Sequence, residues 1–331
     1  MSFSPSRVST SNFILHPRIF IVHCTKIRSM SKNHLGYCCI NLTLGESGIT
    51  ANRGMVKKTF TERGLAYASE LALKNIKDLY QIIAWNNKTG IKMYRMTSDL
   101  FPWFSEYEIK DLPDYESICQ HLILCGKEAK DNGQRLTFHP SHFAILASQN
   151  EDVVTKALKE LRQHGEIMDI MELERSHKYP INIHVNTAKP TKEDAANRFC
   201  KAFDQLDESA KTRLVVENDD KKSAFTPTDL YELVHKKIGI PITFDFHHFK
   251  CNPDSLTEEE ALELCISTWG ENRALTHYSD SRKIYEDISA RDVAHSDWIW
   301  TKELPTYGKE FDIELEVKMK ELALLKLIES I

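Results

Sequence analysis

Six residues with metal-binding side chains stand at the ends of six consecutive short apolar runs. Three are imidazoles and three are carboxylates, a mixture that suits Mn, Zn or Fe better than Ca or Mg alone. A single histidine at such a position is more often a satisfied polar residue than a ligand. Six in series at the same structural position make that alternative much weaker. The six residues are His139, His184, Glu217, Asp245, His277 and Glu316.

Two further histidines extend this set. His248 lies three residues after Asp245, and His295 lies in the loop after the seventh apolar run. Eight candidate ligands are too many for one ion, which takes about four to six. We therefore expect two or three divalent metal ions, with Mn as the first choice and Zn or Mg as the alternatives. Closely spaced cations commonly act on phosphate esters, so phosphodiester hydrolysis is the first hypothesis. A metal-dependent sugar isomerase is the rival, although such enzymes usually need fewer histidine ligands.

Short apolar runs alternate with longer helical patterns through most of the chain. The runs are nearly continuously apolar, as parallel strands covered on both faces must be. Eight such units predict an α/β fold, a single (β/α)8 TIM barrel domain over residues 35–331, in which the chemistry belongs at the C-terminal ends of the strands. A doubly wound open sheet is the alternative fold. The predicted strands are Leu35–Ile40, Ile91–Met96, Arg135–His139, Ile181–Val185, Arg213–Glu217, Pro241–Asp245, Arg273–His277 and Phe311–Glu316.

The intervals between the runs carry helix signals. Thr226 and Pro227 open one predicted helix, which Gly239 closes, and Thr257 with Glu260 forms a capping-box pattern. No glycine-rich phosphate loop follows any run, which weakens a nucleotide-binding interpretation. Apolar stripes at helical spacing are formed by Val154, Ala157, Leu158 and Leu161, and by Ile118, Leu122, Cys125 and Ala129.

Composition and charge describe a globular protein with a basic beginning. The chain has 331 residues with 43 Lys+Arg and 48 Asp+Glu, and it is 41% hydrophobic. It contains no stretch of about 20 apolar residues that could cross a bilayer. Residues 1–34 carry five basic residues and no acidic one, which leaves 38 basic and 48 acidic residues, or −10, for the rest. We interpret residues 1–34 as a flexible or irregular N-terminal extension that weakly resembles an organelle presequence.

An acidic body argues at first against a non-specific nucleic-acid binder. Two or three divalent cations would add about +4 to +6 at the mouth of the barrel, so that the metal-loaded face could still attract DNA. The eight cysteines are scattered without a CxxC pair. Their pattern indicates neither a disulfide framework nor a zinc ribbon, and it favours a reducing, intracellular location.

Read with their neighbours, the candidate ligands resemble the ultraviolet damage endonuclease family over roughly residues 35–325. Each motif alone is weak, whereas all of them in family order are specific. The motifs are Leu35-Gly36-Tyr37, Asn41-Leu42-Thr43-Leu44, Tyr94-Arg95-Met96, Leu100-Phe101-Pro102, Phe138-His139-Pro140, Val216-Glu217-Asn218-Asp219, Asp245 to His248, Asn252-Pro253, Thr276-His277-Tyr278-Ser279, Ala294-His295-Ser296-Asp297 and Glu316-Val317-Lys318.

The resemblance implies a fold and an activity. Members look like TIM barrels related to three-metal apurinic endonucleases, and they nick duplex DNA immediately 5′ to ultraviolet photoproducts and other distorting lesions. The implied products are a 3′-hydroxyl and a 5′-phosphate, and the implied partner is damaged double-stranded DNA, with no membrane and no obligate protein partner. An apurinic-site endonuclease or a general phosphodiesterase on the same barrel is the alternative, and the sugar isomerase is a distant third.

The resemblance also assigns roles within the site. Glu217 would be a catalytic, bridging carboxylate, and Lys318 would lie near the phosphate. The resemblance also implies three ion sites. His139 and His184, together with Glu217, would hold the first ion. Asp245, His277 and Glu316 would hold the second, and His248 and His295 would hold the third.

Residues that contact DNA and probe the lesion are implied as well. They map to Tyr37, Asn41, His142 and Phe143, where aromatic rings would replace part of the stacking lost when the damaged bases flip out. Core packing of Phe143 and hydrogen bonding of Tyr37 at a strand end are the structural alternatives. This chain departs from the family pattern at two positions. His142 occupies a position where members usually carry Gln. Leu275 occupies a position where members often carry Lys, so a carboxylated-lysine bridge is not available there.

Overall fold

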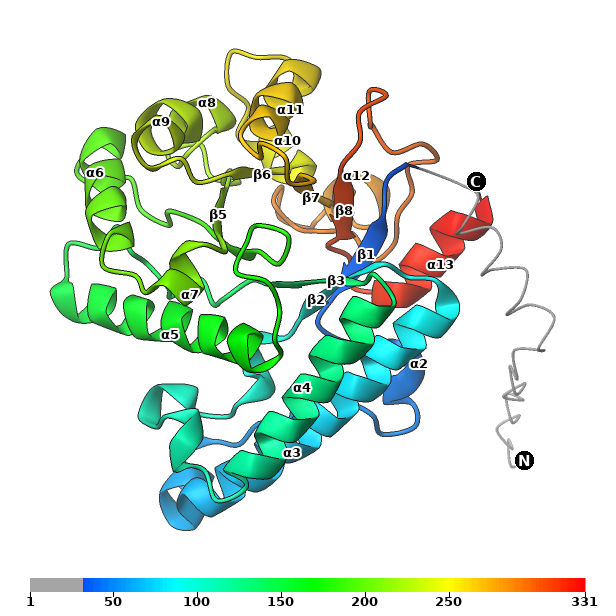
Figure 1. Ribbon diagram of the computed structural model, residues 1–331. Coiled ribbons are helices and arrows are strands. Elements are labelled where there is room, and N and C mark those ends of the chain that lie inside the picture. The colour runs from blue at the N-terminus through cyan, green and yellow to red at the C-terminus, as the bar shows by residue number, and fades with distance from the viewer. Residues whose placement is uncertain (1–31, 331) are drawn as a thin grey trace, which may run out of the picture.

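Eight parallel strands close into a barrel in a computed structural model that describes residues 32–330. Each strand pairs with the next along the chain, and the last pairs with the first (Figure 1). The predicted TIM barrel is therefore confirmed. All eight predicted strands are found, each of them shorter than predicted by one or two residues. The strands are β1 (Leu35–Cys38), β2 (Met93–Met96), β3 (Arg135–Phe138), β4 (Ile181–Ile183), β5 (Leu214–Glu217), β6 (Ile242–Asp245), β7 (Leu275–Tyr278) and β8 (Asp312–Leu315).

Helices follow the strands and cover the outside of the barrel (Figure 1). Apolar side chains from both layers form one continuous core, which includes Ile76, Leu79, Leu122 and Leu161. The α-helices are α2 (Leu42–Gly45), α3 (Lys57–Thr89), α4 (Tyr115–Asp131), α5 (Glu151–Ile170), α6 (Lys192–Phe203), α7 (Glu208–Lys211), α8 (Pro227–Leu230), α9 (Lys236–Ile238), α10 (Phe246–Cys251), α11 (Glu258–Ser267), α12 (Arg282–Tyr285) and α13 (Lys320–Ser330). Single turns are η1 (Ser98–Leu100), η2 (Phe104–Glu106) and η3 (Ile109–Asp111), with a π-helical turn η4 (Tyr231–His235).

The helix signals of the sequence stand where they were expected. The Thr226 side chain accepts a hydrogen bond from the backbone N–H of Asp229 and caps α8. Gly239 follows α9 in the left-handed conformation with φ 72°, which an L side chain rarely adopts. Thr257 and Glu260 form a reciprocal capping box at the start of α11. The two predicted apolar stripes lie on α5 and α4 and are largely buried.

Buried ion pairs lie at the N-terminal end of the barrel. Asp312 of β8 reaches across to Arg135 of β3, with 2.9 Å between Oδ2 and Nη1. Its other oxygen lies 2.5 Å from Nε of Arg273. The Asp312 side chain is only 2% exposed, so these charges are buried together. Because β3 and β8 are not neighbours in the sheet, the pair ties the barrel across its interior.

The folded body begins before the predicted boundary at residue 35. The Asn33 side chain accepts a hydrogen bond from the Phe311 backbone N–H at 3.1 Å. Nδ1 of His34 lies 3.1 Å from Oδ1 of Asp312. These two residues, assigned above to the extension, therefore belong to the barrel. Lys32 is described too, with its Nζ 2.8 Å from Oε1 of Glu310, whereas residues 1–31 of the predicted extension lie outside the described residues.

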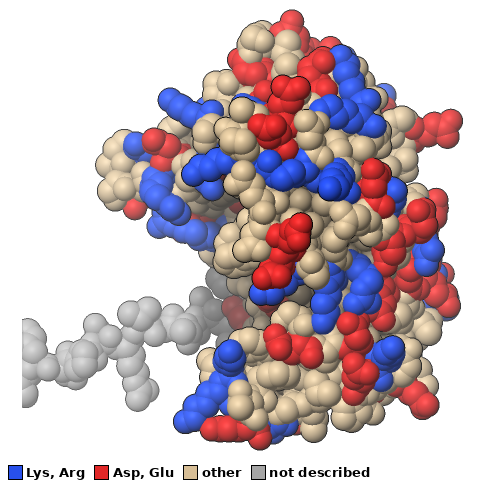
Figure 2. Space-filling view, turned by 90° about the vertical axis from the view of Figure 1, so that its left-hand side faces the viewer, with Lys and Arg blue, Asp and Glu red and all other residues tan. Residues whose placement is uncertain are grey.

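The surface carries both signs of charge. Figure 2 shows lysine and arginine side chains interspersed with aspartate and glutamate on the face that it draws, so a single sign does not cover that face. Among residues 32–330, no helix is both long and apolar enough to cross a membrane.

Candidate metal centre

The C-terminal ends of the strands bring seven of the eight predicted ligands into one cluster. The cluster consists of three overlapping groups, and within each group the ligand atoms lie within 4.8 Å of one another. Glu217 belongs to the first and second groups, and Asp245 belongs to the second and third. This matches the expectation that parallel strands present their terminal side chains at one mouth. The groups are His139, His184 and Glu217; Glu217, Asp245 and His248; and Asp245, His277 and Glu316.

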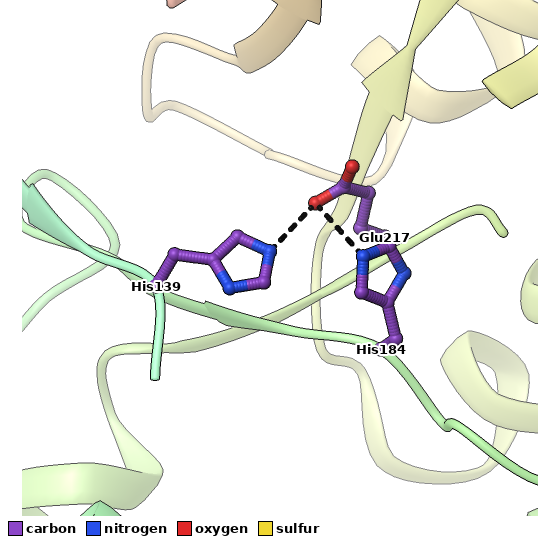
Figure 3. A group of neighbouring side chains, drawn as sticks. All are labelled: His139, His184 and Glu217. Atoms are coloured by element: carbon purple, nitrogen blue, oxygen red, sulfur yellow. Dashed lines mark hydrogen bonds and ion pairs between the residues drawn. The ribbon is translucent and has the colours of Figure 1, made fainter. Parts of the chain in front are cut away.

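The first group converges on a single oxygen atom. Nε2 of His139 lies 3.3 Å, and Nε2 of His184 lies 3.7 Å, from Oε2 of Glu217 (Figure 3). The histidines follow β3 and β4, and the glutamate ends β5. Nδ2 of Asn182 donates a hydrogen bond to the same oxygen from within β4. Three neighbouring strands thus hold this group together.

Helix α10 sets the position of the second group. Oδ1 of Asp245 accepts a hydrogen bond from the His248 backbone N–H at 2.7 Å and so caps the helix. The ring of His248 has Nδ1 at 3.0 Å from the Asn218 carbonyl oxygen and 3.2 Å from Oε1 of Glu217. The turn that follows β6 therefore brings both Asp245 and His248 close to Glu217.

The third group joins β6, β7 and the residue after β8. Nδ1 of His277 lies 3.1 Å from Oε2 of Glu217 and 3.2 Å from Oε1 of Glu316. Arg95 of β2 donates from Nη2 to the same Glu316 oxygen. Glu217 is consequently approached by imidazoles of both outer groups, and its bridging role stays a prediction.

Two predicted site residues lie at the margin of the cluster. Nδ1 of His295 is 3.8 Å from Oε2 of Glu316, and its ring centre is 5.8 Å from that of His248. His295 is in none of the three groups found among the described residues. Lys318 is 56% exposed, and its Nζ lies 3.1 Å from Oδ1 of Asp297. Its role near a phosphate stays a prediction.

Buried polar atoms without a hydrogen bond indicate that the cluster fits metal ions. Within residues 32–330, Oε1 of Glu217, Oδ2 of Asp245, Nδ1 of His184 and Nδ1 of His277 are buried and make no hydrogen bond. The atoms of Glu217, His184 and His277 have only ion-pair contacts, at 3.1–3.6 Å, with other side chains of the site. A buried polar atom without a hydrogen bond costs about 1–3 kcal/mol. Four such atoms at one mouth, all of them metal-binding types, are therefore explained if divalent cations complete their bonding.

The charges of the cluster are strongly coupled. Burial alone would raise the pKa of Glu217, but the imidazoles of His277 and His184 hold it well below its ordinary value. Burial lowers the pKa of His139. Burial likewise opposes protonation of His277, yet Glu217 raises its pKa to about 10. Opposite charges packed this closely out of water are typical of a functional site.

Sequence reasoning missed several polar residues beneath the ligands. Nε of Arg95 lies 2.7 Å from Oε2 of Glu314, and Nη2 lies 3.1 Å from Nε2 of His277. Oδ1 of Asp219 lies 3.6 Å from Nδ1 of His184. Residues two positions apart on a strand share a face, so Glu314 could have been found by stepping back from Glu316. Arg95 had a signal only as part of a family motif.

Tyr37 and Asn41 are both buried and hydrogen-bonded to each other. The Tyr37 ring is 0% exposed and packs at 5.1 Å, centre to centre, against the Tyr94 ring. Its hydroxyl donates to Oδ1 of Asn86 on α3 at 2.8 Å and accepts from Nδ2 of Asn41 at 2.8 Å. Asn41 is itself buried and caps α2. Both side chains are enclosed between the barrel and its helices, and their contacts with DNA stay a prediction.

His142 and Phe143, in contrast, lie on the surface beyond β3. Phe143 is 68% exposed, which rules out the core-packing alternative. The two rings contact each other at 4.0 Å between centres. They lie three and four residues after His139, so the exposed pair and a candidate ligand share one loop. Leu275, at the position where the family often has Lys, is buried in β7 and offers no donor atom.

Comparison with known proteins agrees with this geometry. Residues 33–331 match the family described as UV-endonuclease UvdE. The UV DNA damage endonuclease of Clostridium perfringens is 29% identical over 306 residues, covering 90% of this chain and 70% of that protein. The UV-damage endonuclease of Schizosaccharomyces pombe is 31% identical over 309 residues, which are 89% of this chain. The chain spans about half the length of the S. pombe protein, since the match covers 50% of it.

Solved structures show the same relationship. The crystal structure of SacUVDE has a TM-score of 0.79 with 28% identity, and the match covers 90% of this chain and 97% of that one. An Escherichia coli 3-keto-D-glucoside 4-epimerase has a TM-score of 0.53 at 9% identity over 90% of this chain and 97% of that one, a likeness that shows the fold alone. The family match covers nearly the whole described chain, including every ligand of the cluster. The chain therefore belongs to the UV-endonuclease UvdE family.

Proposed function

We propose that this protein is a metal-dependent DNA repair endonuclease that nicks duplex DNA 5′ to ultraviolet photoproducts and other distorting lesions. The products would be a 3′-hydroxyl and a 5′-phosphate. The observation that carries the proposal is the set of three overlapping ligand groups that share Glu217 and Asp245 at the mouth of the barrel. Membership of a family whose relatives are named UV-damage endonucleases supplies the substrate class.

The ligand set suits phosphodiester hydrolysis. When bound, closely spaced divalent cations lower the pKa of a water molecule and neutralise charge on the departing oxygen. His139, His184 and Glu217 would hold one ion, and Asp245, His277 and Glu316 a second. His248, with His295 at the margin, is left for a third. Mn is the preferred ion for this mixture of imidazole and carboxylate donors, with Zn or Mg as the alternatives.

The protein's own residues bind and orient the substrate. Glu217 is held in place by Asn182 and four imidazoles, so the geometry exists before DNA arrives. Lys318 carries an exposed ammonium group next to Asp297, from which it can turn to a DNA phosphate. The exposed ring of Phe143 can stack on a base at the mouth. Damaged bases unstack at lower cost than intact ones, which favours lesions over normal duplex.

Nicking of plasmid DNA tests the proposal directly. Ultraviolet-irradiated and untreated supercoiled plasmids are incubated with the protein and Mn²⁺, with and without EDTA. We expect relaxed circles from the irradiated plasmid alone, and none with EDTA. A synthetic duplex with one thymine dimer then locates the cut, and extension of the product by a polymerase reports a 3′-hydroxyl. Equal cutting of untreated plasmid would make the enzyme a general phosphodiesterase. Cutting confined to an abasic duplex would make it an apurinic-site endonuclease.

A further inference from the structure

A buried carboxylate lies directly beneath one of the candidate ligands. Glu314 of β8 is the ladder partner of His277 of β7, so their side chains lie on one face of the barrel sheet. Oε2 of Glu314 lies 3.2 Å from Nε2 of His277. Both side chains are fully buried, and neither the ligand groups nor the sequence patterns include Glu314. Its carboxylate therefore needs a function other than direct ligation.

Two donors hold Glu314 in one orientation. Nε of Arg95 lies 2.7 Å from Oε2, and the Thr137 hydroxyl donates to Oε1. The guanidinium also donates from Nη2 to Glu316, the residue after β8. Glu314 and Glu316 therefore share one arginine. A carboxylate fixed from two sides can in turn fix whatever it binds. The remaining neighbour of Oε2 among the described residues is Nε2 of His277.

The two nitrogens of the His277 ring face different surroundings. Nδ1 points to the ligand cluster, at 3.1 Å from Glu217 and 3.2 Å from Glu316. Nε2 points down to Glu314. A neutral imidazole carries one proton, so a ring that gives its Nδ1 lone pair to a cation must keep the proton on Nε2. Nη2 of Arg95 lies 3.1 Å from Nε2 but has its own acceptor in Glu316, which leaves Glu314 to accept the Nε2 proton.

We propose that Glu314, held by Arg95 and Thr137, is a positioning residue that accepts the Nε2 proton of His277 and directs its Nδ1 lone pair to the metal centre. The inference deepens the proposed metal site and rests on it. A carboxylate behind a metal-binding histidine fixes the tautomer and the ring orientation, and its loss typically weakens metal binding about 10–100-fold. The strand alternation that places Glu316 at the mouth places Glu314 one layer below it.

Two substitutions separate hydrogen bonding from charge. Glu314→Met keeps the approximate volume and removes the acceptor, so we expect Mn²⁺ binding, measured by calorimetry, to weaken about 10–100-fold for one ion. Glu314→Gln keeps an amide oxygen where Oε2 stands, so its affinity is expected to remain within a few-fold of wild type. Thr276→Val on β7 is the matched control, with affinity expected at the wild-type value, because it removes a buried hydroxyl that donates to the Asp312 carbonyl and not to Glu314. Wild-type affinity of a folded Glu314→Met protein would overturn the proposal.

Nitrogen-15 NMR of the wild-type protein loaded with Zn²⁺ provides a readout that needs no variant of Glu314. We expect the His277 ring, assigned with a His277→Gln sample, to be protonated at Nε2 and metal-bound at Nδ1. Binding through Nε2, or an unprotonated Nε2, would refute the positioning role even if Glu314→Met does not fold. Neither measurement involves DNA. A protein with this tautomer that fails to nick irradiated plasmid would disprove the proposed function alone.

Discussion

Nδ1 of His277 lies 3.1 Å from Oε2 of Glu217, although the two residues stand on β7 and β5 with β6 between them. The same oxygen is approached by His139 and His184 from the other side. Glu217 is thus the point at which the two outer ligand groups meet. Its loss should affect the whole centre rather than one ion.

We expect Glu217→Gln to abolish nicking of irradiated plasmid while leaving binding to damaged duplex largely intact. The amide keeps the shape of the side chain but removes the charge that four imidazoles face. Gel-based nicking and fluorescence anisotropy measure the two properties separately. Asp220→Asn, a neighbouring carboxylate outside the ligand groups, is the control. Nicking by Glu217→Gln at near wild-type rate would remove Glu217 from the chemistry.

Phe143→Ala should reduce discrimination between damaged and intact duplex. Stacking of one base on an aromatic ring contributes about 1–3 kcal/mol, which corresponds to roughly 5- to 150-fold in Kd. Because the ring is largely exposed, the free energy of unfolding should change by less than about 0.5 kcal/mol. Leu124→Ala, at an exposed apolar position on α4, is the matched control. Unchanged ratios of Kd for the two duplexes would show that Phe143 does not probe lesions.

Tyr37→Phe tests the structural role that burial assigns to this tyrosine. The substitution removes only the hydroxyl that joins Asn86 to Asn41. Leaving these buried amides without their partner should lower the free energy of unfolding by about 1–3 kcal/mol. Urea denaturation measures this loss, and the ratio of affinities for damaged and intact duplex should stay the same. An unchanged free energy of unfolding with lost discrimination between damaged and intact duplex would instead support a contact of Tyr37 with DNA.

Asp312 gives the protein a pH-dependent contribution to stability. Burial alone would raise its pKa, but hydrogen bonding to His34 and the charge of Arg135 lower it to about 2. A carboxyl group with a depressed pKa in the folded state stabilises the protein above its unfolded pKa of about 3.9. That contribution, about 2 kcal/mol, disappears as the pH falls from about 4 towards 2.

The Asp312→Asn variant isolates this contribution. Its deficit in free energy of unfolding relative to wild type should be largest near pH 6 and should shrink as the pH falls below about 4. Urea denaturation at a series of pH values measures the difference. Glu303→Gln, at an exposed position, should show almost no deficit at any pH. A deficit for Asp312→Asn that does not vary with pH would mean that its charge is not responsible.

The ligands could be predicted from sequence because strand ends in a barrel meet at one mouth wherever the strands lie in the chain. The prediction stopped at the ends, so it passed over Glu314 and Arg95, which lie one layer lower. It also did not foresee the buried environment of Tyr37. The direction of an aromatic side chain at a strand end depends on which face it takes and on what packs there. In this chain α3 supplies Asn86 as the partner, a contact between residues 49 positions apart that no local pattern reveals.

The cross-barrel ion pairs also constrain the order in which the protein can form during synthesis. Arg95 is made 219 residues before Glu314, and Arg135 is made 177 residues before Asp312. At about 5–20 residues per second, the ribosome needs roughly 10–40 s to deliver the partners. Until then both guanidinium groups must stay in water, because enclosing an unpaired charge is costly. The barrel interior therefore closes only when nearly the whole chain has been translated. A half-length product would leave the guanidinium groups of Arg95 and Arg135 without their carboxylate partners.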